Sequence, residues 1–176
     1  MAMRIRQSSS ADLEAIRQLH LQAFGESEGE AVSQLALQLL QQVSPDEMLS
    51  LVAEQQGEII ANVIFSRVSV DTNEQPAGYI LCPLAVMPTV QRCGIGKGLI
   101  REGLQMLTKR GAGYVLVLGD PDYYSRSGFH ANHQLDPPYP LPYPQAWLAQ
   151  ELEAGVLANI TGSVRCADCL MVPEYW

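Results

Sequence analysis

Y-I-L-C-P-L-A-V at residues 79–86 is typical of a buried strand, and Q-R-C-G-I-G-K-G follows it at residues 91–98. The second segment predicts a glycine-rich turn that opens a helix, and this helix ends where Arg110 is followed by Gly111. Glycines let a ligand approach the backbone closely, and the free amides at a helix start attract an anion. We therefore predict a phosphate-binding turn between this strand and this helix.

Length and charge restrict the class of protein. The chain has 176 residues, with 11 Lys and Arg against 19 Asp and Glu and a net charge of −8. We expect one domain over residues 1–176. An acidic protein is a poor nucleic-acid binder because phosphate contacts need basic side chains. The sequence has no apolar run of about 20 residues and no apolar signal-peptide core near its start, so we expect a cytoplasmic protein without a membrane partner.

The cysteines do not predict a metal site. Cys82, Cys93, Cys166 and Cys169 are expected to be thiols in a protein of this class. Cys166 and Cys169 form a C-x-x-C pair, but no second pair stands at zinc-site spacing, and the pair does not follow an early strand as a thioredoxin-like motif would. We predict no metal, and the role of this pair stays open.

Hydrophobic periodicity predicts an α/β protein in the order β-α-α-β-β-β-α-β-α-β, followed by a loop, a helix and a strand. Gln56 and Gly57 predict a tight turn between the second and third strands. The predicted strands cover residues 4–6, 49–54, 58–70, 79–86, 114–119, a segment that opens at Phe129, and 161–166.

Helix signals are concentrated near the start of the chain. The run led by Asp12 predicts an amphipathic helix that Gly25 ends, with His20 on the helix surface. The acidic residues 26–30 are expected to link it to a second helix that ends before Pro45.

Later in the chain the signals are shorter. Pro121, capped by Asp120, predicts a brief helix that Gly128 ends, and a further helix is expected at about residues 145–152. Residues 71–77 are expected to form a polar loop.

Two familiar phosphate-binding motifs do not fit the glycine-rich turn. A Walker loop needs Ser or Thr after its lysine, where this chain has Gly98, and it needs Gly where this chain has Gln91. A dinucleotide fingerprint needs G-x-G-x-x-G, whereas Gly94, Gly96 and Gly98 follow the spacing G-x-G-x-G. From these residues alone, a turn that only packs its helix close to a sheet remains an alternative.

The segment L-A-V-x-P-x-x-Q-R-x-G-I-G-x-G-L resembles the acetyl-coenzyme A motif of the GNAT superfamily of N-acetyltransferases. Its signature Q/R-x-x-G-x-G/A is matched by Gln91, Gly94 and Gly96. A second motif of the family, Y-x-x-x-G-F, is matched by Tyr124, Gly128 and Phe129. The resemblance covers a motif-bearing core of about residues 1–135. The extension at residues 136–176 is similar to a bacterial branch described as predicted N-acetyltransferases.

The resemblance implies a mixed central sheet that is splayed between its fourth and fifth strands, with helices on both faces. Such a splay would explain Pro83, which cannot donate a hydrogen bond to a neighbouring strand. It also implies acetyl-CoA as co-substrate, with its pantetheine along the fourth strand and its pyrophosphate at the turn. The implied cofactor-binding residues are Leu84, Ala85, Val86, Gln91, Arg92, Cys93, Gly94, Ile95, Gly96, Lys97 and Gly98.

The implied reaction is direct attack on the thioester by a primary amine of a small molecule or a protein. The N–H of Val86 would stabilise the oxyanion, and Tyr124 would protonate the leaving thiolate, since a phenol with a pKa near ~10 is protonated at neutral pH. Tyr123 is the fallback acid. Many relatives carry an Asn before this tyrosine, and its contacts are in doubt here because D-P-D-Y-Y lacks one. Asp120 is a candidate replacement.

The general base and the acceptor amine are not evident from the sequence. The weak candidates for the base are Glu26, Glu28, Glu30, Cys82, His130 and His133, and a chain of waters is another option. Residues 24–30 and 136–144 are expected to choose the acceptor. Two alternatives stay open: a non-catalytic acyl-CoA-binding sensor or interaction module, and a transferase of a longer acyl group. The long C-terminal extension is compatible with a homodimer.

Overall fold

The computed structural model describes residues 2–71 and 76–176, so most of the polar loop predicted at residues 71–77 lies outside the described part. The chain forms two compact units. The first unit comprises Met1–Phe65 and Pro83–Gly103, and the second comprises Ser66–Cys82 and Leu104–Trp176.

The chain forms an open, mixed sheet of eight strands, which confirms the predicted α/β class. The strand order is β1-β2-β3-β4-β5-β7, and β8 pairs with β3 and β6. The strands are β1 (Arg4–Gln7), β2 (Met48–Gln55), β3 (Glu58–Val70), β4 (Gly78–Val86), β5 (Tyr114–Leu118), β6 (Gln134–Asp136), β7 (Trp147–Glu151) and β8 (Thr161–Arg165). The helices are α1 (Leu13–Gln42), α2 (Ile95–Lys109) and α3 (Pro121–Tyr124), and short 3-10 turns lie in several of the connections to the strands.

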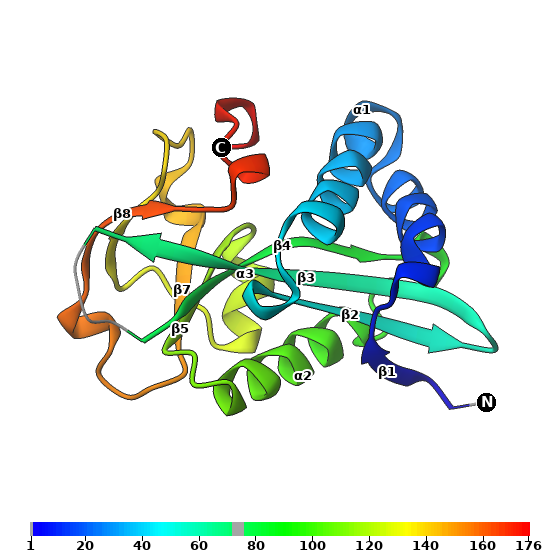
Figure 1. The fold of residues 1–176 in the computed structure, drawn as a ribbon, viewed down its shortest axis with the longest axis horizontal. Helices are drawn as coiled ribbons and strands as arrows, with labels where there is room; N and C mark the ends of the chain where they lie inside the picture. The colour runs from blue at the N-terminus through cyan, green and yellow to red at the C-terminus, as the bar shows by residue number, and fades with distance from the viewer. Residues whose placement is uncertain (1, 72–75) are drawn as a thin grey trace. The chain divides into compact units, whose positions relative to one another are not determined.

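Helix α1 of the first unit is a hairpin of two helical arms (Figure 1). The predicted break at Gly25 is confirmed, because this residue has φ 73° and ψ −166°. The acidic residues 26–30 are not a link, however: they form the first turns of the second arm. The arms approach each other at Gly29, where an added Cβ would lie 2.8 Å from the carbonyl oxygen of Leu21. A residue without a side chain is therefore required at this crossing.

Helices cover both faces of β3 within the first unit. Asn62 and Phe65 differ by an odd number of positions and so point to opposite faces of the strand. On one face, His20 of α1 contacts Asn62 with 2.9 Å between Nε2 and Oδ1. On the other, the ring of Phe65 packs on Gly103 of α2, where a Cβ would overlap it. This double cover explains why residues 59–65 form an unbroken buried run.

His20 was predicted on the helix surface, and this is wrong: its side chain is fully buried. Asn62 Nδ2 donates to the Leu51 carbonyl at 2.9 Å and to Ser50 Oγ at 3.1 Å, so Asn62 Oδ1 accepts from His20 Nε2. His20 Nδ1 has no partner among the described residues. Burial lowers the pKa of His20 and keeps the ring neutral.

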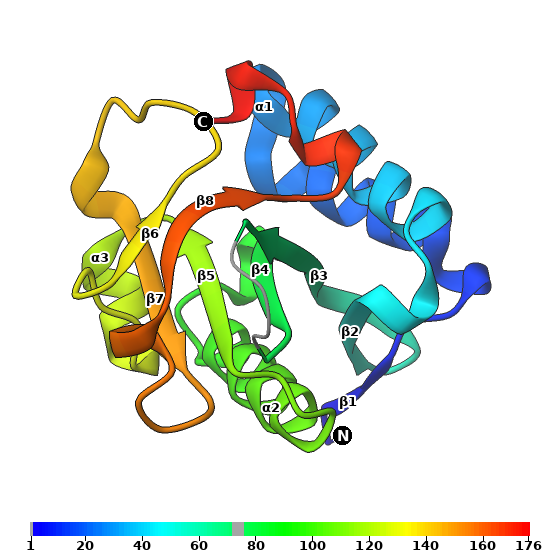
Figure 2. The same ribbon diagram turned by 60° about the vertical axis from the view of Figure 1, so that its left-hand side comes forward.

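In the second unit, β7 lies antiparallel beside β5, and β6 runs parallel to β8 (Figure 2). The helix predicted at about residues 145–152 is wrong, because this segment forms β7 with Trp147 opposite Leu118. Phe129 does not open a strand either. His130 forms an isolated bridge to Ala149, and β6 begins only at Gln134.

The parallel pairing of β4 and β5 is short. It joins Gly78–Ile80 to Tyr114–Leu116, whereas β4 continues through Pro83 to Val86. Gly78 allows this pairing because the ring of Tyr114 occupies the place where a Cβ would stand.

Replacing Gly29 by Ala tests the crossing of the two α1 arms. At an exposed helix position this change would stabilise the fold by about 1 kcal/mol. Here we expect a loss of about 1–3 kcal/mol in the free energy of unfolding, because the new Cβ presses on backbone atoms of Leu21. Urea denaturation measures the change, with the exposed Ser27→Ala in the same arm as control. A stabilised Gly29→Ala variant would contradict the crossing.

The buried His20 predicts how stability changes with pH. Its pKa is lowered in the folded state, so below about pH 6.5 the unfolded chain binds a proton that the folded chain does not. The free energy of unfolding should therefore fall between pH 7 and pH 5. We expect His20→Gln to reduce this slope and Ser27→Ala, an exposed position without a titratable group, to leave it. An unchanged slope in His20→Gln, measured by denaturation at each pH, would refute the assignment.

Candidate active site

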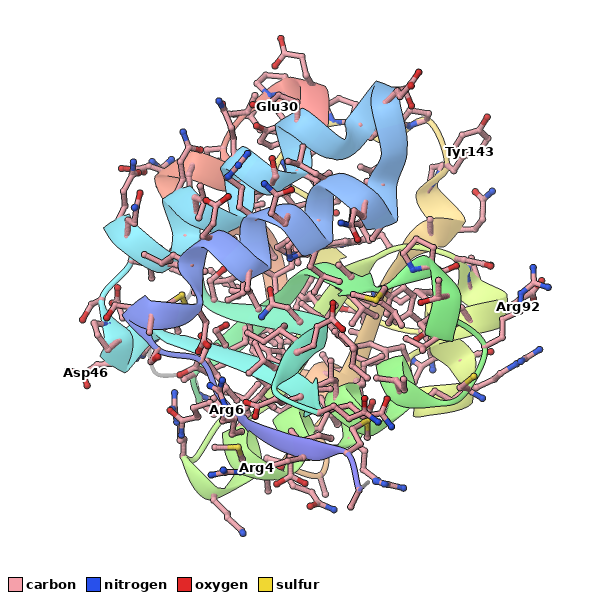
Figure 3. All side chains as sticks on the ribbon, turned by 90° about the vertical axis from the view of Figure 1, so that its right-hand side faces the viewer. Arg4, Arg6, Glu30, Asp46, Arg92 and Tyr143 are labelled. Atoms are coloured by element: carbon pink, nitrogen blue, oxygen red, sulfur yellow. The ribbon has the colours of Figure 1, made fainter. Side chains whose placement is uncertain are left out.

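The glycine-rich turn of the first unit passes through two residues with a positive φ before α2 begins. Helix α2 begins at Ile95, after Gly94 with φ 82°. Arg92 also has a positive φ of 63°, which is uncommon for a residue with a side chain, and its side chain extends outward (Figure 3). Lys97 is exposed as well, whereas Gly96 is buried. The turn thus presents backbone amides and two cations on one short segment.

The end of β4 is held at a single peptide unit. The N–H of Met87 donates to the Ile60 carbonyl of β3 at 2.8 Å. The carbonyl of the same unit, that of Val86, accepts from Gln91 Nε2 at 3.0 Å. The motif residue Gln91 therefore contacts the strand that precedes its own turn, a contact that no sequence signal indicated.

The three β4 residues predicted to meet the pantetheine alternate in exposure. Ala85 is buried, whereas Leu84 and Val86 are partly exposed. Cys93 and Gly94 lie in the turn and are exposed, and the Cys93 thiol donates weakly to the Gln91 carbonyl at 3.5 Å. Of these residues, Val86 and Cys93 contact Gln91 directly, and the cofactor contacts of all of them remain predictions.

Tyr124 of the second unit stands at the end of α3. The carboxylate of Asp120 caps this helix by accepting from the Asp122 N–H at 3.0 Å, as predicted. The Tyr124 ring lies on Gly119, where a Cβ would overlap it, and meets the Phe129 ring edge-on at 5.8 Å. Burial raises the pKa of the Tyr124 phenol above its ordinary value, with smaller effects from Tyr123 and Cys82. The phenol therefore stays protonated at neutral pH.

The candidate bases differ in their surroundings. Glu26, Glu28 and Glu30 are exposed on the second arm of α1, and His130 is exposed too. Burial lowers the pKa of His133, whose Nε2 lies 3.0 Å from the Trp147 carbonyl. Burial raises the pKa of Cys82 to about 12, so this thiol is neither a base nor a nucleophile at neutral pH.

The four cysteines are free thiols, as predicted. Among residues 2–71 and 76–176, no group of three or more His, Cys, Asp or Glu side chains could hold a metal ion. None of the helices in these ranges is long and apolar enough to span a bilayer.

The first unit also contains a hollow of about 410 Å³ beside Met87, lined by the first arm of α1 and the start of β3. Arg6 lines it but donates to both Asp12 oxygens, at 2.8 and 2.9 Å, and to Glu54 at 2.9 Å. These bonds hold the pKa of Asp12 at about 2. The Arg6 guanidinium is therefore shared between two carboxylates, those of Asp12 and Glu54.

Residues 13–129 match the model of the family described as the Acetyltransferase (GNAT) family. This match includes the glycine-rich turn, α2 and the Y-x-x-x-G-F motif. The chain belongs to the GNAT acetyltransferases, which confirms the predicted family and enzyme class.

Similar proteins extend over nearly the whole chain. An uncharacterised N-acetyltransferase of Escherichia coli strain K12, YjhQ, is 36% identical over 168 residues, which cover 92% of this chain and 90% of YjhQ. The crystal structure of E. coli YhbS in complex with CoA superposes with a TM-score of 0.84 at 29% identity, over 96% of this chain and 91% of that chain. A GNAT acetyltransferase of Brucella melitensis in complex with acetyl-CoA gives 0.75 at 29% identity, over 96% and 98%.

The contact between Gly119 and Tyr124 is testable by a double-mutant cycle. Gly119→Ala should cost about 1–3 kcal/mol in the free energy of unfolding, because the new Cβ displaces the Tyr124 ring. In a Tyr124→Ala background the same change should cost much less, since the ring is gone. Equal costs in both backgrounds, measured by denaturation, would show that the two residues do not contact each other.

Proposed function

We propose that the protein transfers an acetyl group from acetyl-CoA to a primary amine by direct attack of the amine on the thioester. The observation that carries this proposal is the exposed turn before α2, joined through Gln91 to the peptide unit at the end of β4. The membership of the chain in the GNAT family supports acetyl-CoA as the cofactor, and so do the CoA and acetyl-CoA complexes of its structural relatives.

In this proposal, Leu84, Ala85 and Val86 border the pantetheine and the thioester. The amides of residues 92–97 are proposed to hold the pyrophosphate, where the positive end of α2 favours negative charge. The Gly98 N–H donates to the Gly94 carbonyl at 3.0 Å, so Gly98 would allow close approach of the cofactor and would not donate to it. Arg92 and Lys97, both exposed, add cations to the phosphates. The N–H of Val86 donates to the carbonyl oxygen as negative charge develops on it.

The Tyr124 phenol is the proposed general acid. As the amine nitrogen forms a bond to the acetyl carbon, the C–S bond breaks and the leaving thiolate takes the phenol proton. The nitrogen then releases one proton, which balances the proton that restores the phenol. Burial raises the pKa of the phenol, which keeps it protonated at neutral pH but makes it a weaker proton donor than an exposed tyrosine. Enclosure of the leaving thiolate, which the same burial destabilises, is what favours the transfer. The base that deprotonates the ammonium is not assigned, and an ordered water can serve.

Acceptor choice is proposed to involve the tip of the α1 hairpin and the loop at residues 136–144. The tip exposes Glu26, Glu28 and Glu30, which favours a cationic amine. In the loop, the side chain of Tyr143 is 69% exposed (Figure 3). The class of acceptor, a small molecule or a peptide, follows from an amine panel assayed for free CoA. A cytoplasmic location and a homodimer stay predictions.

Tyr124→Phe tests the acid directly. We expect kcat to fall about 100-fold, because no proton donor replaces the phenol, while the Kd of acetyl-CoA measured by isothermal titration changes by less than about twofold. Tyr175→Phe, outside the motif, controls for the loss of a hydroxyl. Unchanged turnover in Tyr124→Phe would exclude the role, and a comparable loss in Tyr123→Phe would move it to that residue.

Isothermal titration also separates the proposed reaction from its alternatives. No binding of acetyl-CoA would contradict the proposal. Tight binding without turnover of any amine would favour a sensor, and higher kcat/KM with longer acyl-CoA chains would favour a transferase of those groups.

A further inference from the structure

The C-terminal segment, residues 166–176, follows β8 and folds back onto the second unit (Figure 2). The ring of Trp176 meets the ring of Trp147, in β7, edge-on at 5.6 Å. The Tyr139 hydroxyl donates to the Met171 carbonyl at 3.1 Å. The C-terminal segment is therefore held against β7 and against the loop that follows β6.

This segment also brings the C-x-x-C pair to β4. Burial raises the pKa of Cys82 to about 12, and the charge of Cys169 adds to the effect. Burial raises the pKa of Cys166 to about 12 as well, with additions from Cys82 and Cys169. Cys82 is in turn one of the groups that raise the pKa of Tyr124, after burial and Tyr123. Because the effect of a charge weakens with distance, the C-terminal segment lies beside Cys82, and Cys82 lies beside the proposed acid.

The register of the sheet places Cys82 where the pairing of β4 with β5 has ended. The last paired residues are Ile80 and Leu116. Two positions further along, Cys82 comes level with Leu118, which pairs on its other side with Trp147 of β7. Trp147 is also the residue that anchors the end of the C-terminal segment. The segment is therefore fixed at the level of the sheet where Cys82 lies.

The order of residues along β4 indicates which substrate meets this level. In the proposed function, residues 84–86 border the pantetheine and the thioester, and residues 92–97 hold the pyrophosphate. Cys82 precedes both groups in the chain, so along β4 it lies past the thioester, away from the phosphates. The cofactor covers the phosphate side of the thioester, which leaves the Cys82 side for the amine. Of the C-x-x-C pair beside Cys82, Cys166 is buried, whereas Cys169 is partly exposed.

We propose that Cys169 is a specificity-determining residue whose side chain forms part of the wall that the acceptor amine meets beside Tyr124. This inference rests on the proposed function. Burial raises the pKa of Cys169, so this part of the wall is uncharged at neutral pH. A small, neutral side chain leaves room for a substituent next to the amine nitrogen, and a larger one would exclude it. Within the pair, Cys166 packs in the interior and Cys169 faces the acceptor.

The experiment adds the same bulk at two neighbouring positions. Cys169→Phe enlarges the proposed wall, whereas Asp168→Phe enlarges a side chain that is 94% exposed. The substrate is the primary amine of the panel with the highest kcat/KM. We expect Cys169→Phe to raise the KM of this amine about tenfold, with kcat within about threefold and the Kd of acetyl-CoA within about twofold. Asp168→Phe and the conservative Cys169→Ser should leave all three values unchanged.

Alkylation of the unaltered protein gives a second readout that needs no variant. The Cys169 thiolate displaces iodide from iodoacetamide, forming a C–S bond, and peptide mass spectrometry quantifies each cysteine separately. CoA and the same amine together form a complex without an acetyl group to transfer. We expect this complex to slow alkylation of Cys169 about threefold or more, and CoA alone to change it by less than about twofold. Alkylation of the exposed Cys93, in the glycine-rich turn, reports that CoA is bound.

Two results would overturn this inference alone: an unchanged KM of the amine in a folded Cys169→Phe variant, or alkylation of Cys169 that the amine does not slow. Protection of Cys169 by CoA alone would place it on the cofactor side and would also overturn the inference. A chain that binds acetyl-CoA but turns over no amine would overturn the proposed function, and this inference with it. Thermal unfolding establishes whether Cys169→Phe is folded, and the alkylation result decides where it is not.

Discussion

Burial of β3 on both faces is the constraint on which the first unit depends. A strand covered on each side penalises unpaired polar groups, and Asn62 lies inside with its amide satisfied by His20, Ser50 and Leu51. On the opposite face, Phe65 allows α2 to approach only where Gly103 has no side chain. The same strand supplies the Ile60 carbonyl that holds Met87. The position of β3 thereby fixes the end of β4, which borders the proposed reaction site.

The candidate site is built mostly from main-chain groups. The amides of the turn, the Val86 N–H and the carbonyl capped by Gln91 are present whatever side chains line the acceptor side. Oriented backbone dipoles are effective in such sites because they need little reorganisation as charge develops. In the proposed reaction one side chain, the Tyr124 phenol, would supply the proton, and burial raises its pKa. A family built in this way can change acceptors while it retains its reaction.

Signals that depend on neighbouring residues were interpreted correctly from the sequence. The break at Gly25, the cap at Asp120 and the helix end at Gly128 follow from backbone sterics and short-range hydrogen bonds. The same holds for the turn at Gly94 and the start of α2. The cofactor and the candidate acid were predicted from the resemblance to the family, because composition and periodicity do not indicate either of them.

Signals that depend on partners far along the chain were misread. The segment W-L-A-Q-E-L-E has apolar residues that suit either a helix or a strand, and pairing with β5 makes part of it the strand β7. His20 looked like a surface residue because its helix is amphipathic, and only Asn62, 42 positions later, gives it a buried partner.

Short-range sterics therefore account for the order of most elements and for the glycine-rich turn, while the motif pair was identified by resemblance to the family. Only the tertiary structure shows that Gln91 donates to the Val86 carbonyl, that the Ile60 carbonyl holds the Met87 N–H and that Gly119 leaves room for the Tyr124 ring. These contacts form only after β3, β4 and the turns have packed. Each one joins two groups whose directions depend on the backbone torsions and on packing between residues far apart in the sequence. No local pattern encodes such directions.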